Sequence, residues 1–204
     1  SVLKYKGKTN ETFTAYMLNL ALCASDFNYD DAVTVLDPMC GRGTTLFEAV
    51  NNGWSCVGLD ADAASVDEAA KYFKKYLEYH GFKHEQRLQS MTMAGKKSCQ
   101  TRVFTFGADA AAFKRGEERR TLTLARLEAQ DVSKLYRKQA FHLITADLPY
   151  GVQHAPSVNK RRGADIEDLL YAALPAWNDC LLTGGAMCLS FNENTIKPEI
   201  IRGM

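Results

Sequence analysis

Val33-Thr34-Val35-Leu36-Asp37-Pro38-Met39-Cys40-Gly41-Arg42-Gly43-Thr44-Thr45 is the stretch that decides the fold of this 204-residue chain. An apolar run leads into a turn with two glycines, and a segment with helical character begins at Thr44. Glycine lets the backbone approach a ligand closely, and the first turn of a helix has free N–H donors. A strand, a glycine turn and a helix N-terminus in this order predict a pocket of nucleotide size.

The glycine turn lacks the signals of the common phosphate-binding loops. Its spacing is Gly-x-Gly, without the third glycine of the dinucleotide fingerprint, and no Gly-Lys-Ser/Thr follows for a triphosphate. Asp37 precedes the turn, where its carboxylate could hold an amino group. These features favour a positively charged cofactor without phosphates over NAD or ATP.

The length and composition fit a single domain, residues 1–204, with 46% hydrophobic residues. The formal net charge is +1, so a nucleic-acid surface would be a local patch. The six cysteines form no Cys-x-x-Cys pair, which predicts reduced thiols and no zinc site. With no signal peptide and no transmembrane run in the sequence, we expect a cytoplasmic protein without a membrane or metal partner.

Strands and helices alternate along the chain, which predicts an α/β fold with a mostly parallel sheet and helices on both faces. Residues 1–31 are expected to form an N-terminal helical extension, with Asn10 as N-cap. Residues 82–120 are expected to be an insertion, whose polar first part, 82–101, is interpreted as a surface loop. The expected strands are 33–36, 56–59, 102–106, 121–127, 141–146 and 186–191. The main expected helices are 13–24, 44–52, one that Asp62 caps and Gly81 stops, and 165–182. Residues 107–120 are expected to form a short helix and an exposed turn.

Four aspartates, Asp37, Asp60, Asp131 and Asp147, follow expected strands. Parallel sheets bind ligands at the carboxyl ends of their strands, near the point where the strand order reverses. Asp60 lies 17 residues after Gly43, close to the spacing at which an acid binds ribose in dinucleotide folds. It could also be a helix cap or a solvated turn residue, and Asp131 could equally cap the helix that follows it.

Asp147-Leu148-Pro149-Tyr150 is the second distinctive stretch. A nucleobase amine could donate to the Asp147 carboxylate and the Leu148 carbonyl while Tyr150 stacks on the base. The nitrogen lone pair would then face an electrophile in line, and Asp147 could take the released proton. The alternative is a tight turn that carries a surface tyrosine.

Residues 37–44 resemble motif I of class I S-adenosylmethionine-dependent methyltransferases. This form of motif I is similar to the one in the RNA methylase group, which includes the THUMP-associated tRNA and rRNA guanine-N2 methyltransferases. Residues 147–151 resemble motif IV of amino-methyltransferases, (Asp/Asn/Ser)-Pro-Pro-(Tyr/Phe). The resemblance covers residues 33–191. It implies a Rossmann-like class I methyltransferase fold.

The implied reaction is direct methyl transfer from S-adenosyl-L-methionine to an exocyclic base nitrogen, foremost guanine N2 of tRNA or rRNA, with S-adenosyl-L-homocysteine as product. Adenine N6 of DNA or RNA is the alternative acceptor. A second alternative is an inactive cofactor-binding module or subunit. Metal is not needed for this chemistry, because the sulfonium supplies the electrophile.

The same resemblance assigns residues to the site. Asp60 would hold the ribose hydroxyls, and Asp131 and Val132 would flank the adenine. Residues 6–9 lie where related enzymes close over the methionine part. The implied catalytic residues are Asp147, Leu148, Pro149 and Tyr150, and the implied cofactor-binding residues are Asp37, Pro38, Cys40, Gly41, Gly43, Thr44, Asp60, Ala61, Asp131, Val132 and Asp147.

The sequence departs from the family pattern in three ways. Leu148 replaces the first proline of motif IV, which predicts a less rigid turn. No region corresponds to a THUMP module, so the chain is either a catalytic fragment or finds its RNA otherwise. The sequence stops soon after residue 191, so we expect it to lack part of the C-terminal hairpin of the family sheet.

A basic run, Lys160-Arg161-Arg162, follows the second motif. A basic loop beside a base pocket could bind RNA phosphates. A solvated charged loop is an equal alternative.

Overall fold

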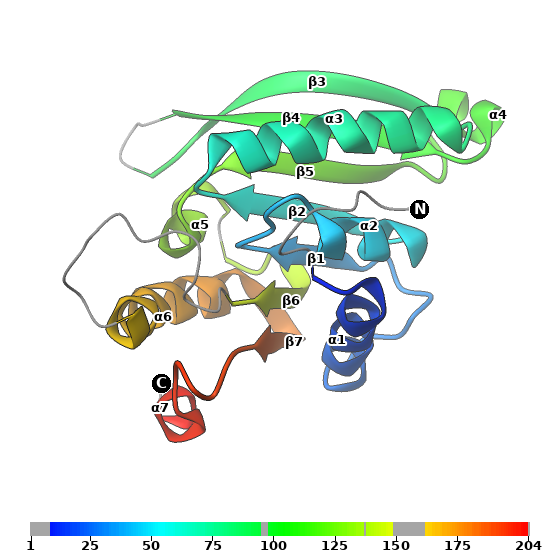
Figure 1. Ribbon diagram of the computed structural model, residues 1–204. Helices are drawn as coiled ribbons and strands as arrows, with labels where there is room; N and C mark the ends of the chain where they lie inside the picture. The colour runs from blue at the N-terminus through cyan, green and yellow to red at the C-terminus, as the bar shows by residue number, and fades with distance from the viewer. Residues whose placement is uncertain (1–8, 95–97, 137, 149–161, 204) are drawn as a thin grey trace.

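The computed structural model describes residues 9–94, 98–136, 138–148 and 162–203 (Figure 1). These residues contain a seven-stranded sheet in the order β3-β4-β5-β2-β1-β6-β7. Strands β5, β2, β1, β6 and β7 are parallel, whereas β3 and β4 pair antiparallel at one edge. The strands are β1 Thr34–Asp37, β2 Ser55–Asp60, β3 Lys83–Thr92, β4 Ser98–Gly107, β5 Arg120–Arg126, β6 Phe141–Asp147 and β7 Leu181–Ser190.

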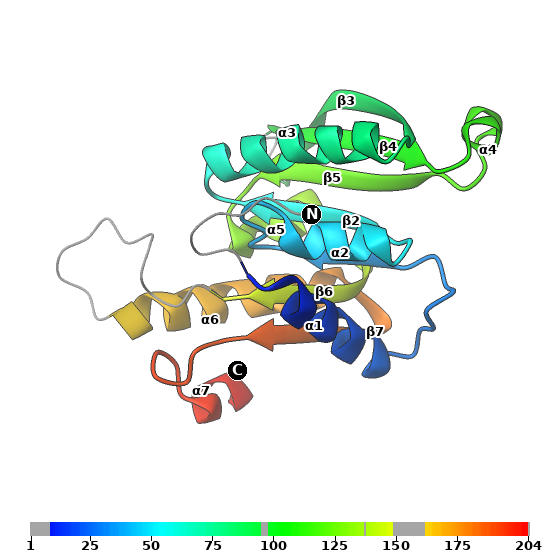
Figure 2. The ribbon, with the colours of Figure 1, turned by 45° about the vertical axis from the view of Figure 1, so that its right-hand side comes forward.

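Helices cover both faces of the sheet, which confirms the predicted α/β fold (Figure 2). Helices α1 (Glu11–Cys23), α2 (Thr44–Asn51) and α3 (Ala63–Tyr79) bury their apolar residues against one face. The opposite face is packed by η1 (Ala129–Asp131), α5 (Val132–Leu135), α6 (Arg162–Cys180) and α7 (Pro198–Arg202). Within the described ranges, no helix is both long and apolar enough to cross a membrane.

Two of the predicted helix starts are confirmed by their capping bonds. The Asn10 side chain accepts a hydrogen bond from the N–H of Phe13 at the start of α1. The Asp62 carboxylate accepts from the N–H groups of Ala64 and Ser65 at the start of α3. Such caps satisfy the N–H groups that a helix leaves without partners in its first turn.

The apolar positions of α1 divide between two faces. Met17 and Ala21 are buried in the core, together with Leu18. Phe13, Tyr16 and Leu20 also fall at helical spacing, but they are 40%, 58% and 43% exposed. Helical spacing therefore identified the helix without showing which apolar side chains it buries.

The interpretation of residues 82–101 as a loop is wrong, because β3 and the first part of β4 occupy this segment. The two strands pair antiparallel from Lys83–Gly107 to Thr92–Ser98. Most β3 side chains are exposed, because β3 is the edge strand of the described sheet. An edge strand with exposed side chains needs no apolar alternation, so backbone pairing creates a strand that the sequence pattern does not reveal.

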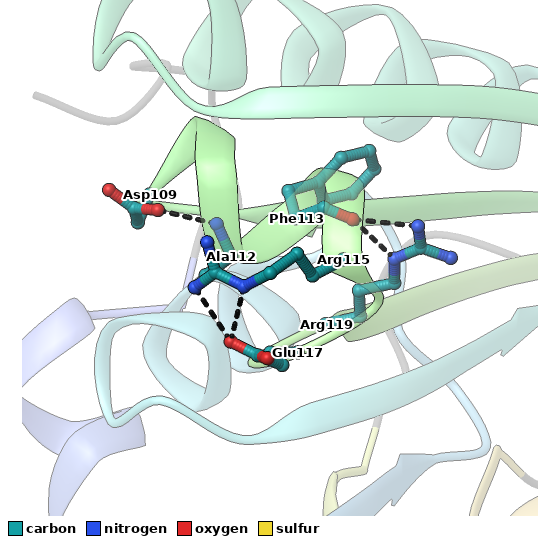
Figure 3. Close-up of polar contacts among 6 residues, drawn as sticks. All are labelled: Asp109, Ala112, Phe113, Arg115, Glu117 and Arg119. Atoms are coloured by element: carbon teal, nitrogen blue, oxygen red, sulfur yellow. Dashed lines mark hydrogen bonds and ion pairs between the residues drawn. The ribbon is translucent and has the colours of Figure 1, made fainter.

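The turn between β4 and β5 contains α4 (Ala110–Arg115), which confirms the expected short helix. Figure 3 shows how polar contacts close it. Asp109 caps the helix, and Arg115 pairs with Glu117 at 2.8 Å. The guanidinium of Arg119 donates twice to the Phe113 carbonyl, at 2.9 and 2.7 Å, and lies over the Phe113 ring. These contacts hold the connection between β4 and β5 in a compact turn.

The glycine turn packs against β2 at Gly58, a residue that the sequence analysis did not single out. A Cβ atom at this position would lie 2.4 Å from Leu46 Cδ1 and 2.9 Å from Cys40 Sγ. Both of these side chains are buried. The strand therefore needs glycine here because the turn and the start of α2 lie directly on its backbone.

We predict that Gly58→Ala destabilises the protein by about 1–3 kcal/mol, because an added methyl group overpacks a buried contact. Urea unfolding would measure the change in the free energy of unfolding. Gly203→Ala is the control, since its new Cβ would meet only ordinary contacts at 3.5 Å. This control should stay within about 0.5 kcal/mol of wild type. Equal effects of the two substitutions would contradict the packing argument.

Candidate active site

Three aspartates end three adjacent parallel strands. Asp37 is the last residue of β1, Asp60 of β2 and Asp147 of β6, as predicted. The fourth aspartate, Asp131, was also expected at a strand end, but it lies in η1, after β5 has ended at Arg126. The arrowheads of β1, β2 and β6 point to the same side in Figure 1. The strand order reverses at β1, because β2 lies on one side of it and β6 on the other. This is the position at which open α/β sheets bind ligands.

Asp60 anchors the glycine turn to β2. Its Oδ2 accepts from the N–H of Gly41 at 2.8 Å, and its Oδ1 accepts from the N–H of Asp62 at 2.8 Å. The turn is also held by the Cys40 N–H, which donates to the Leu59 carbonyl at 2.8 Å. Asp60 is therefore neither the cap of α3 nor a solvated turn residue, because Asp62 makes the capping bonds.

The backbone of the turn is open to a ligand. Gly41 and Gly43 have φ angles of 52° and 91°, which L side chains rarely adopt. A Cβ at Gly41 would meet nothing within 4 Å, so space remains beside the backbone. Gly43 is the N-cap of α2 and supplies no side-chain cap. The first turn of α2, beginning at the buried Thr44, thus keeps N–H donors beside the turn.

Asp37 is a buried carboxyl, only 3% exposed. Its Oδ1 accepts from the N–H of Met39 at 3.0 Å, and the Thr45 hydroxyl also bonds to it. Burial, with a smaller contribution from the negative charges of Asp60 and Asp147, nevertheless raises the pKa of Asp37 from 3.8 to about 7. A positively charged ligand at this edge would relieve that repulsion.

Cys40 fits a packing role. Its thiol is buried against β2, and burial raises the pKa of Cys40 well above its ordinary value. The charges of Asp37 and Asp60 act in the same direction. The thiolate is therefore strongly disfavoured, as expected for a residue that packs rather than attacks. Pro38 is buried beside it.

The two residues expected near adenine behave differently. The Asp131 carboxylate is partly exposed and pairs with the Lys134 ammonium at 2.6 Å, and it makes no capping hydrogen bond. Val132 is 0% exposed, so it supports the site from the core and has no surface to place beside a ligand. Gln130, which the sequence analysis missed, has a buried Oε1 for which the described residues provide no partner.

Leu148 takes part in sheet pairing. Its side chain is 1% exposed in the core below α6, and its N–H donates to the Ser190 carbonyl at 2.8 Å. A proline has no N–H and could not make this bond. Because Leu148 stands where motif IV has its first proline, the end of β6 forms a hydrogen bond to β7 at this position. Pro149, Tyr150, Lys160 and Arg161 lie outside the described residues, as does the side chain of Arg162.

Two contacts support the rim of the site. The Arg126 Nε donates to the Ala61 carbonyl at 3.1 Å, which joins the ends of β5 and β2. Arg42 of the turn pairs with Glu68 of α3 at 2.6 Å. Both members of this pair are partly exposed, so the pair contributes little stability. Ala61 itself is exposed, as a ligand contact would require.

Thr9 adds a contact to the site. Its hydroxyl donates to Asp147 Oδ2 at 2.7 Å. The sequence analysis placed residues 6–9 over the cofactor, and 6–8 lie outside the described residues. The structure thus brings Thr9 to the end of β6.

A separate groove of about 310 Å³ lies on the face of the sheet opposite to α1, α2 and α3. Two of its lining residues, Thr34 and Phe141, begin β1 and β6, whereas Asp37 and Asp147 end these strands. The groove therefore lies at the opposite end of the strands from the aspartates. Its lining residues are Thr34, Val57, Gln89, Met91, Val103, Thr121, Thr123, Tyr136, Ala140 and Phe141.

Comparison with known proteins gives one family match. The model of the family described as "RMKL-like, methyltransferase domain" matches residues 2–204. A search of curated proteins gave no match.

Several solved structures are similar to this chain at low sequence identity. An rRNA methyltransferase from Streptomyces viridochromogenes is 16% identical, with a TM-score of 0.52, 92% of this chain covered and 76% of that one. A Pyrococcus horikoshii protein, provisionally described as an RNA methyltransferase, is 11% identical, with a TM-score of 0.49 and coverage of 99% and 73%. An S-adenosylmethionine-dependent methyltransferase from Clostridium acetobutylicum is 15% identical, with a TM-score of 0.47 and coverage of 90% and 51%. The chain thus spans about half to three quarters of these proteins' lengths.

We predict that Asp37→Asn removes a pH-dependent loss of stability. Above pH 3.8 the unfolded carboxyl ionises, while the folded one stays protonated until about pH 7. This group therefore lowers the free energy of unfolding as the pH rises through that window, by on the order of 4 kcal/mol. Without cofactor, the variant should be more stable than wild type at pH 7.5, as urea unfolding would show.

The matched control is Asp30→Asn, at an exposed position. It should leave the shape of the wild-type stability curve unchanged between pH 4 and 7.5. If Asp37→Asn and wild type gave parallel curves over this range, the buried carboxyl would not be the source of the loss.

Proposed function

The chain belongs to the family of RMKL-like methyltransferase domains, and on that premise we propose that it methylates an exocyclic amino nitrogen of a nucleobase in RNA. Guanine N2 of tRNA or rRNA is the first candidate acceptor. S-adenosyl-L-methionine is the methyl donor implied by the family. The observation that carries the proposal is the edge formed by Asp37, Asp60 and Asp147 around an open glycine turn.

The residues at this edge fit the proposed donor. S-adenosyl-L-methionine carries a sulfonium and an ammonium group, and its reactive methyl group is the electrophile that it supplies when bound. A cationic ligand suits an edge where carboxylates repel one another and raise the pKa of Asp37. In the proposed arrangement, Asp37 and the turn hold the amino-acid end, Asp60 holds the ribose hydroxyls, and Asp131 accepts from the adenine amine.

Asp147 is the proposed acceptor for the target amine. Its carboxylate would accept one N–H of the base and hold the nitrogen lone pair in line with the methyl group. As the nitrogen–carbon bond forms, the carbon–sulfur bond breaks and its electron pair stays on sulfur. The nitrogen then releases one proton, which Asp147 would take. The proposal assigns base stacking to Tyr150 and phosphate contacts to Lys160, Arg161 and Arg162.

The choice of RNA is supported by the resemblance of residues 37–44 to motif I of the RNA methylase group, and the Streptomyces protein of similar fold is an rRNA methyltransferase. Adenine N6 remains the alternative acceptor, because motif IV serves both bases. A cytoplasmic location is part of the same proposal.

We predict that Asp60→Ala weakens S-adenosyl-L-methionine binding about tenfold to a hundredfold, because a charged hydrogen-bond partner of the ribose and the anchor of Gly41 are both lost. Isothermal titration calorimetry measures the dissociation constant. Asp62→Ala is the control, because it removes a cap of α3 two residues away. An unchanged affinity in Asp60→Ala would exclude the ribose assignment.

We predict that Asp147→Asn retains cofactor affinity and lowers the rate of methyl transfer by at least about a hundredfold, as expected for the loss of a positioned base. Single-turnover transfer of labelled methyl groups to unmodified tRNA and rRNA transcripts measures the rate. Transfer at the wild-type rate would contradict the assigned role of Asp147.

Nucleoside mass spectrometry tests the acceptor. Total tRNA and rRNA from cells with and without the gene would be hydrolysed and compared. Loss of N2-methylguanosine is the expected result. Loss of N6-methyladenosine would select the alternative, and unchanged nucleosides would refute RNA base methylation.

A further inference from the structure

A hydrogen bond joins Thr9, which lies just before α1, to the end of β6. The Thr9 hydroxyl donates to Asp147 Oδ2 at 2.7 Å, across 138 positions of sequence. The bond is partly buried. It therefore connects the proposed amine acceptor to a residue outside both sequence motifs.

The chain next to Thr9 is firmly held. The Asn10 carbonyl accepts from the N–H and the hydroxyl of Thr14, at 2.9 and 3.0 Å. The Asn10 side chain accepts from the N–H of Phe13 at 3.1 Å. Thr14 is 1% exposed and Leu18 is fully buried, so α1 is fixed against the core. Thr9 thus extends from a capped and packed helix.

The Thr9 hydroxyl acts on a carboxylate that has a charged neighbour. The charge of Asp147 contributes to the raised pKa of Asp37, so the two carboxyl groups interact. A hydroxyl that donates to Oδ2 offsets part of this repulsion and restricts rotation of the Asp147 carboxylate. Small errors in the orientation of a reacting group can cost large factors in rate.

We propose that Thr9 is a positioning residue of the active site, whose hydroxyl sets the orientation in which Asp147 meets the target amine. This inference rests on the proposed role of Asp147. It makes Thr9 a part of the methyl-transfer site that lies outside both sequence motifs.

The test compares Thr9→Val, which removes the hydroxyl at nearly constant volume, with Thr9→Ser, which keeps it. Single-turnover transfer to unmodified tRNA and rRNA transcripts gives the rate, and calorimetry gives cofactor affinity. Thr9→Val should lower the rate about tenfold to a hundredfold, since it removes a hydrogen bond to a charged group. Thr9→Ser should stay within about threefold of wild type, and cofactor affinity should not change in either variant.

A double-mutant cycle distinguishes positioning from general damage. If Thr9 acts through Asp147, Thr9→Val should add no further loss in the Asp147→Asn background. Multiplicative losses would overturn the inference, and so would a Thr9→Val defect confined to cofactor affinity. If Asp147→Asn is impaired while Thr9→Val matches wild type, this inference alone fails. If Asp147→Asn matches wild type, the proposed function fails with it.

Discussion

The site depends on the contact between the glycine turn and the end of β2. Asp60 receives one N–H from the turn, at Gly41, and one from the start of α3, at Asp62. One carboxylate thereby fixes two chain segments that lie beside each other only in the folded protein. Gly58 allows this contact, because any side chain there would collide with Leu46 and Cys40. The open backbone at Gly41 is a consequence of this arrangement.

The same edge carries an electrostatic cost. Burial raises the pKa of Asp37, and the charges of the neighbouring carboxylates of Asp60 and Asp147 add a smaller increase. Hydrogen bonds from Met39 and Thr45 offset only part of that effect. Proteins often keep such locally unfavourable groups at functional sites, where a ligand supplies the missing interaction. A cationic methyl donor would do so here, and its binding would favour the ionised carboxylate.

Sequence patterns predicted structural elements correctly where local chemistry was sufficient. They failed where strand pairing or side-chain packing decided the structure. Asp62 caps α3 as predicted, because a cap depends on residues within one turn. The strand β3 was missed, because an exposed edge strand carries no hydrophobic alternation. The place of Val132 beside the adenine stays a prediction, although its side chain is buried in the core with α6. The assigned roles of Asp37, Asp60 and Asp147 stay predictions, although their shared edge is confirmed.

The sequence by itself determined the alternation of strands and helices outside the β3 segment, the glycine turn and the family-like motifs at residues 37–44 and 147–151. These features are local, since they depend on side-chain periodicity, backbone freedom and capping within a few residues. Only the tertiary structure decided that Thr9 meets Asp147, that the Leu148 N–H bonds to Ser190, and that Asp60 anchors the turn. Each of these contacts joins residues that are distant in sequence. Their hydrogen-bond partners depend on how the helices and strands pack together, and a short window of sequence does not contain that information.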